Sequence, residues 1–132
     1  MALAYNFGTK KKDDLKIRVN CYELGGGRIL SNMLQAPLSA KNIPDIASLC
    51  ICVDLSKPGN VIDSLLFWLN AAREHSGNAI KDLQNIKVEA FGAYRKEADD
   101  YWKNVPAANE KNQLKINLIP MTVICTKYDI YA

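Results

Sequence analysis

The amino-acid sequence predicts a three-layer α/β domain with a mostly parallel central sheet and one antiparallel hairpin at its start. Two observations favour this class. An apolar run at 49–53 leads through a polar loop into a helical pattern, and an apolar/polar alternation at 15–24 follows a first apolar segment. At 132 residues the chain is long enough to bury a core, so we expect a single domain over 1–132. The predicted strands are 2–7, 15–23, 49–54 and 119–126.

The apolar run Leu49-Cys50-Ile51-Cys52-Val53 is the centre of the predicted sheet. It contains no charge and no turn-forming residue, which is typical of a strand buried on both faces. The run stops at Asp54, and a helical pattern begins at about Val61. In an α/β sheet the loop after such a strand borders the ligand crevice, so we expect Asp54 to Lys57 to lie near a site.

The first two strands form a predicted antiparallel hairpin. Residues 2–7 are apolar and aromatic, and a charged turn separates them from 15–24, where apolar and polar side chains alternate. Alternation with period two is typical of a strand that is buried on one face. We therefore expect this hairpin to be half-buried.

Three consecutive glycines, Gly25, Gly26 and Gly27, separate this alternation from a helical stretch at 28–35. Exposed amides in such a place can cradle an anion. Alternatively, the glycines only provide a flexible exit from the strand. The residues leave both interpretations open, because neither G-x-x-x-x-G-K-[ST] nor G-x-G-x-x-G occurs in the printed sequence.

Two helices are predicted after the central strand. Asn60 is the expected N-cap of the first, with Asp63 three residues further on. The segment His75-Ser76-Gly77-Asn78 should break or bend this helix, and a second helical pattern covers 80–101. A polar linker at 105–113 then leads to the last strand.

Composition narrows the function classes. The net charge is +3, and the only basic run, Lys10-Lys11-Lys12, is followed at once by two aspartates, so a nucleic-acid-binding surface is not expected. No signal peptide and no run long enough to cross a bilayer occur, which predicts an intracellular protein without a membrane partner. His75 has no catalytic partner nearby in the sequence, and no catalytic residue is predicted.

The cysteines are interpreted as reduced, small apolar core residues, because each lies in an apolar, strand-like run. Zinc sites combine closely spaced cysteine pairs with a second pair or with histidines, and the chain has one distant histidine. The sequence therefore predicts no metal site. The four cysteines are Cys21, Cys50, Cys52 and Cys125.

The last strand has the most specific signal. Pro120 stands at its entry, and its predicted buried part is 121–125. It ends in Thr126-Lys127-Tyr128-Asp129, which resembles the guanine-recognition element [N/T]-K-x-D of Ras-like GTPases. In that element the carboxylate accepts hydrogen bonds from guanine, and the lysine packs along the nucleotide. The resemblance makes Thr126, Lys127 and Asp129 a vestigial guanine-binding set.

The same resemblance extends to the glycine segment. Glu23, with Gly25, Gly26 and Gly27, occupies the place of the D-x-x-G switch element of these GTPases, after the second strand of the hairpin. The order of hairpin, glycine segment, helix, strand, helix and final strand is similar to the middle of a Ras-like, P-loop NTPase-like domain. The resemblance therefore implies an incomplete Ras-like domain.

Three motifs together resemble a narrower family, the dynein light intermediate chains. They are Glu-Leu-Gly-Gly-Gly at 23–27, Val-Asp-Leu-Ser-Lys-Pro at 53–58 and Thr-Lys-Tyr-Asp-Ile at 126–130. The segment Ala-Leu-Ala-Tyr-Asn-Phe-Gly at 2–8 looks most like the branch of the family that belongs to cytoplasmic dynein 2, the motor of retrograde intraflagellar transport. The resemblance spans nearly the full chain.

This resemblance implies a non-catalytic subunit that docks on the dynein heavy chain and supports retrograde transport and cilium assembly. The implied partners are the heavy chain and other dynein subunits, and indirectly microtubules and intraflagellar transport particles. The implied location is the cytoplasm, the cytoskeleton and the cilium, including its axoneme and basal body. No single contact with the heavy chain is placed by a motif.

The chain departs from the Ras-like pattern in two ways. The phosphate-binding loop is expected before Ala2, and Glu23 replaces the switch aspartate that commonly helps to organise Mg²⁺. Without that loop the β- and γ-phosphates have no cradle, so we expect no bound cofactor, neither GTP nor GDP. In the Ras-like sheet, the strand that leads into the phosphate-binding loop lies between the strands that correspond to 15–24 and 49–53. Without it, we expect each of these two strands to have one edge without a neighbouring strand.

Two other interpretations stay open. The chain could be a degenerate small GTPase that binds guanine nucleotide through Thr126, Lys127 and Asp129. It could also be a general α/β interaction domain in which the three motifs are coincidental.

Overall fold

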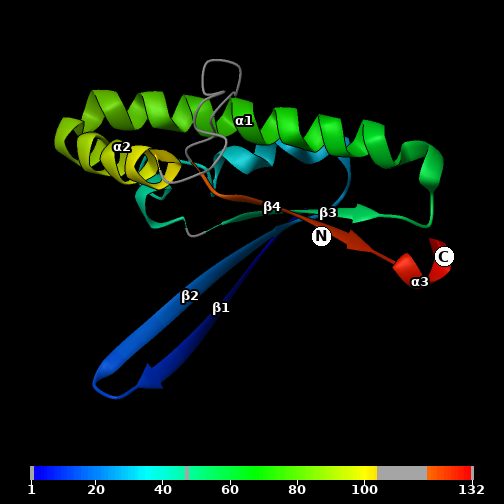
Figure 1. Ribbon diagram of the computed structural model, residues 1–132, viewed down its shortest axis with the longest axis horizontal. Coiled ribbons are helices and arrows are strands. Elements are labelled where there is room, and N and C mark those ends of the chain that lie inside the picture. Colours follow the sequence, from blue (N-terminus) through cyan, green and yellow to red (C-terminus); the bar gives the residue numbers. More distant parts are fainter. Residues whose placement is uncertain (1, 47, 104–118, 132) are drawn as a thin grey trace. The chain divides into compact units, whose positions relative to one another are not determined.

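The computed structural model describes residues 2–46, 48–103 and 119–131 (Figure 1). Contacts divide the chain into two compact units, Met1–Pro37 and Leu38–Ala132. One unit contains an antiparallel two-stranded sheet and the other a parallel two-stranded sheet, so the fold is mixed α/β. The expected joining of the hairpin to a central parallel sheet is wrong for the described residues, because the two sheets share no ladder. A single domain over 1–132 stays a prediction.

The first unit contains the predicted hairpin. Strands β1 (Leu3–Lys12) and β2 (Leu15–Leu24) pair along their full length, from Leu3 opposite Leu24 to Lys12 opposite Leu15. Strand β1 is longer than the predicted 2–7 because the ladder continues to the two-residue turn, where Asp13 has a φ of 53°. Aspartate tolerates this left-handed conformation better than most residues.

The expectation of a half-buried hairpin is wrong. Val19 is 63% exposed and Leu15 is 64% exposed, although both belong to the alternating apolar set of β2. Period two fixes which side chains share a face, but the covering of that face depends on another element. Both faces of β1 and β2 are largely exposed.

Backbone geometry explains why glycine occurs in the segment after β2. The Gly25 amide donates to the Ala2 carbonyl (3.0 Å), which closes the open end of the hairpin. Gly26 has a φ of 84°, and a Cβ there would lie 2.4 Å from Cδ1 of Leu30, so a larger residue would be both strained and crowded. The predicted helical stretch is the 3₁₀ helix η1 (Arg28–Gln35), which begins directly after Gly27.

The second unit has a parallel sheet beneath one long helix. Strand β3 (Leu49–Asp54) pairs in parallel with β4 (Met121–Thr126), from Leu49 opposite Met121 to Asp54 opposite Thr126 (Figure 1). Helix α1 (Val61–Ile86) contacts β3 and the 3₁₀ helix η2 (Ile43–Asp45). Apolar residues from all these parts, and from the residues before β4, form the core. Its most buried side chains are Leu38, Ile43, Ile51, Val53, Ala72, Ala79, Leu83 and Ile119.

Helix α1 begins where predicted, after the short 3₁₀ helix η3 (Pro58–Asn60). Asn60 is at the N-cap position as predicted, although its side chain makes no capping hydrogen bond. The predicted break at 75–78 is wrong, because α1 continues through it to Ile86. Ser76 is buried and donates its hydroxyl to the Arg73 carbonyl (3.2 Å), which satisfies the hydroxyl within the helix.

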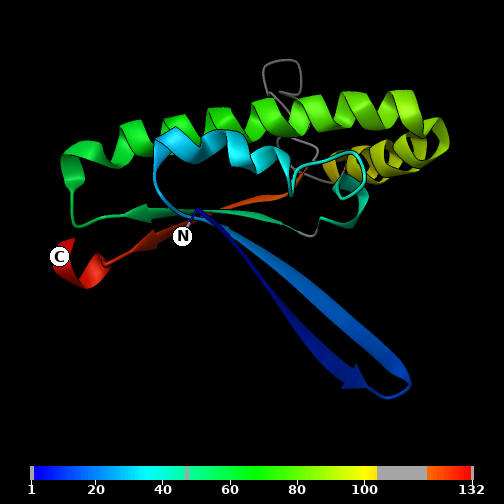
Figure 2. The same ribbon diagram turned by 180° about the vertical axis from the view of Figure 1, so that it is seen from behind.

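The second helix, α2 (Val88–Lys103), packs against α1. The chain changes direction at Lys87, which has a φ of −138°. Both α1 and α2 lie on the same side of β3 and β4, as the two opposite views show (Figures 1 and 2). The three-layer prediction is therefore wrong for the described part of this unit, in which the other side of the sheet has no helical layer. The linker predicted at 105–113 lies outside the described residues.

Strand burial in this unit is one-sided. Ile51 and Val53 are 6% and 2% exposed beneath α1, whereas Cys50 and Cys52 point to the other face and are exposed. The prediction that β3 is buried on both faces is wrong. The prediction of a buried 121–125 is also wrong, because among the described residues β4 pairs with β3 alone, and most of its own residues are exposed.

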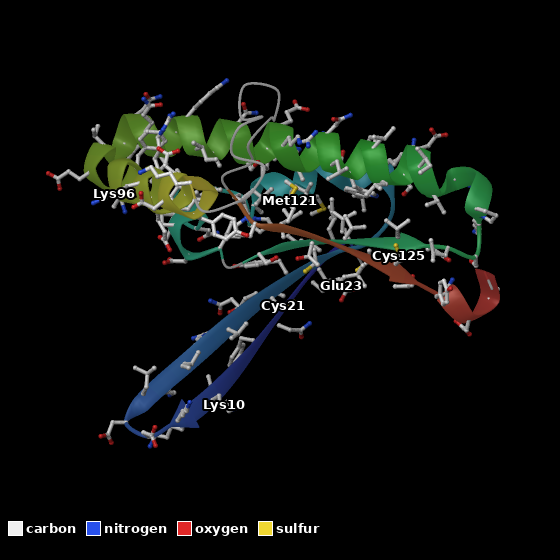
Figure 3. All side chains as sticks on the ribbon, viewed as in Figure 1. Lys10, Cys21, Glu23, Lys96, Met121 and Cys125 are labelled. Atoms are coloured by element: carbon white, nitrogen blue, oxygen red, sulfur yellow. The ribbon has the colours of Figure 1, made fainter. Side chains whose placement is uncertain are left out.

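The expectation that the cysteines fill the core is wrong for all four, which are free and exposed. Cys125 lies near the end of β4 and Cys21 lies on the hairpin (Figure 3). The apolar residues that flank each cysteine in the sequence did not indicate that the cysteine is buried. In the described residues both sheets have only two strands, so every strand has one edge without a neighbouring strand.

Candidate functional site at the carboxyl ends of the parallel strands

The candidate site forms where β3 and β4 end side by side. Because the strands are parallel and Asp54 is opposite Thr126, the loops that follow them leave the sheet at the same edge. The Thr126 hydroxyl donates to the Val53 carbonyl (3.2 Å), and the Leu55 amide donates to the Thr126 carbonyl (3.1 Å). These two hydrogen bonds fix the register of the two loops.

An ion pair connects the loops. The Lys127 ammonium donates from Nζ to Oδ2 of Asp54 at 2.6 Å. The other carboxylate oxygen, Oδ1, accepts from the Ser56 hydroxyl (2.6 Å) and the Ser56 amide (2.9 Å). All of these bonds favour the charged carboxylate, so Lys127 first, and then Ser56, hold the pKa of Asp54 well below its usual range.

The backbone of Lys127 makes this reach possible. Lys127 has a φ of 58°, a conformation that is uncommon for a residue with a side chain. Its carbonyl accepts from the Ile130 amide (3.2 Å), so the chain turns at once into the short helix α3 (Tyr128–Tyr131). The turn directs the lysine back across the sheet edge towards Asp54.

The predicted guanine-binding residues have different surroundings. Thr126 and Lys127 are joined to β3 by the bonds above, and Asp129 lies in the first turn of α3, where its side chain is exposed. The aliphatic stem of Lys127 is the part predicted to pack along a nucleotide, and the ammonium at its end donates to Asp54 in this structure. Binding of a nucleotide by these three residues stays untested.

The predicted switch-like residues lie in the other unit. Glu23 is exposed near the end of β2, opposite Ala4, and Gly25 closes the hairpin. Gly26 and Gly27 both have positive φ angles, of 84° and 75°. Within the described residues, no group of three or more histidine, cysteine or carboxylate side chains could hold a metal ion.

The ion pair between Asp54 and Lys127 is the feature that sequence reasoning missed. The sequence indicated a ligand crevice beside Asp54 and a nucleotide beside Lys127, without connecting the two residues. The signal was present, because both residues directly follow strands that parallel pairing brings to one edge. If β3 and β4 had been predicted as direct neighbours, the ion pair of Asp54 and Lys127 would have been predicted as well.

This pair predicts a measurable pH dependence. The depressed pKa of Asp54 means that its contribution to stability is present above the unfolded-state pKa, about 3.9, and is lost as the pH falls through the lower folded-state pKa. We expect the Asp54 carboxyl ¹³C shift to titrate below pH ~3.9. The Lys127→Gln variant should raise that midpoint, because it removes the largest cause of the shift.

Lys57→Gln is the matched control, since it removes an equal charge from the loop that follows Asp54, and Lys57 is exposed. It should leave the Asp54 midpoint close to its starting value. Equal midpoints in the unchanged chain and in the Lys127→Gln variant would contradict the pairing.

Comparison with known proteins finds relatives that align with nearly the whole chain. Human cytoplasmic dynein 2 light intermediate chain 1 is 27% identical over 134 residues, which cover 99% of this chain and 37% of the relative. The Danio rerio protein of the same name is 28% identical over 138 residues, with coverage of 99% and 36%. The chain is similar to these dynein light intermediate chains over nearly its full length. Human cytoplasmic dynein 1 light intermediate chain 1 is 27% identical over 149 residues, which cover 96% of this chain and 28% of the relative.

The chain spans between 28% and 37% of the length of these three curated relatives. No protein-family model matches it. This similarity agrees with the resemblance inferred from the motifs at 23–27, 53–58 and 126–130. Two of these motifs, 53–58 and 126–130, meet at the candidate site through the ion pair of Asp54 and Lys127.

Proposed function

We propose that this chain acts as part of a light intermediate chain of cytoplasmic dynein 2, a non-catalytic subunit that binds the dynein heavy chain. The observation that carries the proposal is the alignment of 99% of the chain with relatives named cytoplasmic dynein 2 light intermediate chain 1. The role of the subunit is to support retrograde intraflagellar transport and the assembly of the cilium.

The geometry of the site supports a structural role. Thr126 and Lys127 form hydrogen bonds with β3 and so join the two loops. These contacts stabilise the fold, as expected for residues with a structural role. No helix among the described residues is apolar and long enough to cross a membrane. The partners of the subunit are the heavy chain and other dynein subunits, and through them microtubules and intraflagellar transport particles. The subunit is located in the cytoplasm, on the cytoskeleton and in the cilium, and it functions in the cilium.

Capture from ciliated cells tests the proposal. The tagged 132-residue chain is expressed in these cells, recovered, and probed for the dynein 2 and dynein 1 heavy chains. We expect enrichment of the dynein 2 heavy chain over the dynein 1 heavy chain. A folded chain that recovers neither heavy chain, with far-UV circular dichroism confirming helical content, would count against the subunit role.

Guanine-nucleotide binding is the alternative that the Thr126-Lys127-x-Asp129 pattern raises, and thermal shift measures it directly. A ligand at 100 times its Kd would stabilise the folded chain by about 2.7 kcal/mol. We expect no resolvable shift of the melting temperature with 1 mM GDP or GTP and Mg²⁺, because the printed sequence contains no G-x-x-x-x-G-K-[ST] pattern to cradle the phosphates. A shift that Asp129→Asn abolishes would favour the nucleotide-binding alternative, with ATP as the control ligand.

A further inference from the structure

One face of the hairpin combines aromatic rings with cations. The residues that share this face, through the register of β1 and β2, include Tyr5, Phe7, Lys11, Lys16, Arg18 and Tyr22. We call it the aromatic–cationic face. Its rings are well exposed, at 47% for Tyr5, 60% for Phe7 and 46% for Tyr22. The opposite face contains Lys10, Cys21 and Glu23 along the strands (Figure 3).

The aromatic–cationic face is ordered by its own contacts. The Arg18 guanidinium lies 4.4 Å above the centroid of the Phe7 ring, and its Nη2 donates to the Tyr5 hydroxyl (3.1 Å). The Tyr5 hydroxyl and Arg18 Nε both donate to Oδ1 of Asn20, at 2.9 and 3.2 Å. Tyr5 also packs against Tyr22, with ring centroids 5.0 Å apart. A surface cluster that is held in place before binding loses less entropy when a partner docks.

The charge on this face is unbalanced. Lys11 stands directly opposite Lys16 in the ladder, and like charges in this position destabilise a sheet. No carboxylate shares the face, because Glu23 belongs to the other side. On that other side the cations oppose apolar residues, with Lys10 across from Ile17 and Lys12 across from Leu15. The repulsive pair is thus confined to the face that also contains the exposed rings.

We propose that the aromatic–cationic face docks an extended, acidic polypeptide segment of a protein partner. Carboxylates of the segment would neutralise Lys11, Lys16 and Arg18, and its apolar side chains would cover Tyr5 and Tyr22. Tyrosine, phenylalanine and arginine are the residue types enriched in protein interfaces. A polypeptide fits better than single-stranded nucleic acid, because Arg18 already covers a face of the Phe7 ring on which a base would stack.

Neutralising Lys11 and Lys16 together tests the proposal. A fluorescent peptide of alternating Glu and Val, ten residues long to match each strand, is titrated with the full chain at low salt, and anisotropy is recorded. The double variant K11Q/K16Q should bind the peptide about fivefold more weakly, and the unchanged chain should lose affinity as salt rises. The matched control K10Q/K12Q removes two equal charges from the opposite face and should change the affinity less than about twofold.

A second measurement shows whether a change in peptide affinity arises from a change in the fold of the variant. The near-UV circular dichroism of the aromatic side chains, to which the packed pair of Tyr5 and Tyr22 contributes, should be retained in both double variants. K11Q/K16Q should unfold at a higher temperature because its repulsive pair is gone. Equal weakening by the two double variants would overturn the proposal, and so would the absence of binding. Tighter binding of oligothymidine or of phosphatidylserine vesicles than of the acidic peptide would overturn it in favour of nucleic acid or a lipid surface.

Discussion

Leu83→Ala should destabilise the second unit by about 3 kcal/mol. Leu83 is 0% exposed on helix α1, in the same core as Ile43 and Ile51, so truncation leaves a cavity among side chains that are themselves buried. A loss of this size is a large share of the 5–15 kcal/mol that stabilises a typical domain. Urea denaturation followed by far-UV circular dichroism measures it as a lower midpoint.

Ile86→Ala is the control on the same helix. Ile86 is 70% exposed at the end of α1, so its truncation should change the free energy of unfolding by less than about 0.5 kcal/mol. If the two variants lost equal stability, the core assigned to α1 and β3 would be wrong.

Val53→Asp should cost about 4 kcal/mol, because it leaves an unpaired carboxylate in the core. Val53 is 2% exposed on the face of β3 that helix α1 covers. Its neighbour in the ladder, Cys125, offers no positive charge. We expect a chain that is largely unfolded at 25 °C, which the loss of helical signal in far-UV circular dichroism would report.

Cys52→Asp introduces the same side chain one position earlier, on the exposed face of β3. It should cost about 1 kcal/mol or less, the range of strand propensity differences at exposed positions. This pair of variants tests one-sided burial directly. A strand buried on both faces, as its apolar sequence suggests, would be destabilised strongly by both substitutions.

The sequence predicted the positions of the elements better than their surroundings. The strands predicted at 15–23 and 49–54 and the start of α1 at Val61 agree with the structure to within one residue, because alternation, apolar runs and loop residues are local signals. Burial of β3, β4 and the hairpin was overpredicted, since it depends on how many strands and helices gather around each sheet. The predicted break at 75–78 failed because Gly77 is tolerated within a long packed helix.

The candidate site was predicted in part. The sequence placed Asp54 and the Thr126–Asp129 motif at strand ends, which the structure confirms. It did not connect Asp54 with Lys127, because that contact joins residues 73 positions apart and depends on which strands are neighbours. The aromatic cluster of Tyr5, Phe7 and Arg18 was missed for a similar reason, as it arises from the cross-strand register of the hairpin.

The most direct test of the subunit role is binding between purified proteins. The chain is immobilised on a biosensor, and the tail regions of the dynein 2 and dynein 1 heavy chains are passed over it at equal concentrations. We expect saturable binding of the dynein 2 tail and weaker binding of the dynein 1 tail. Absence of binding to both tails, or a preference for the dynein 1 tail, would contradict the assignment to dynein 2.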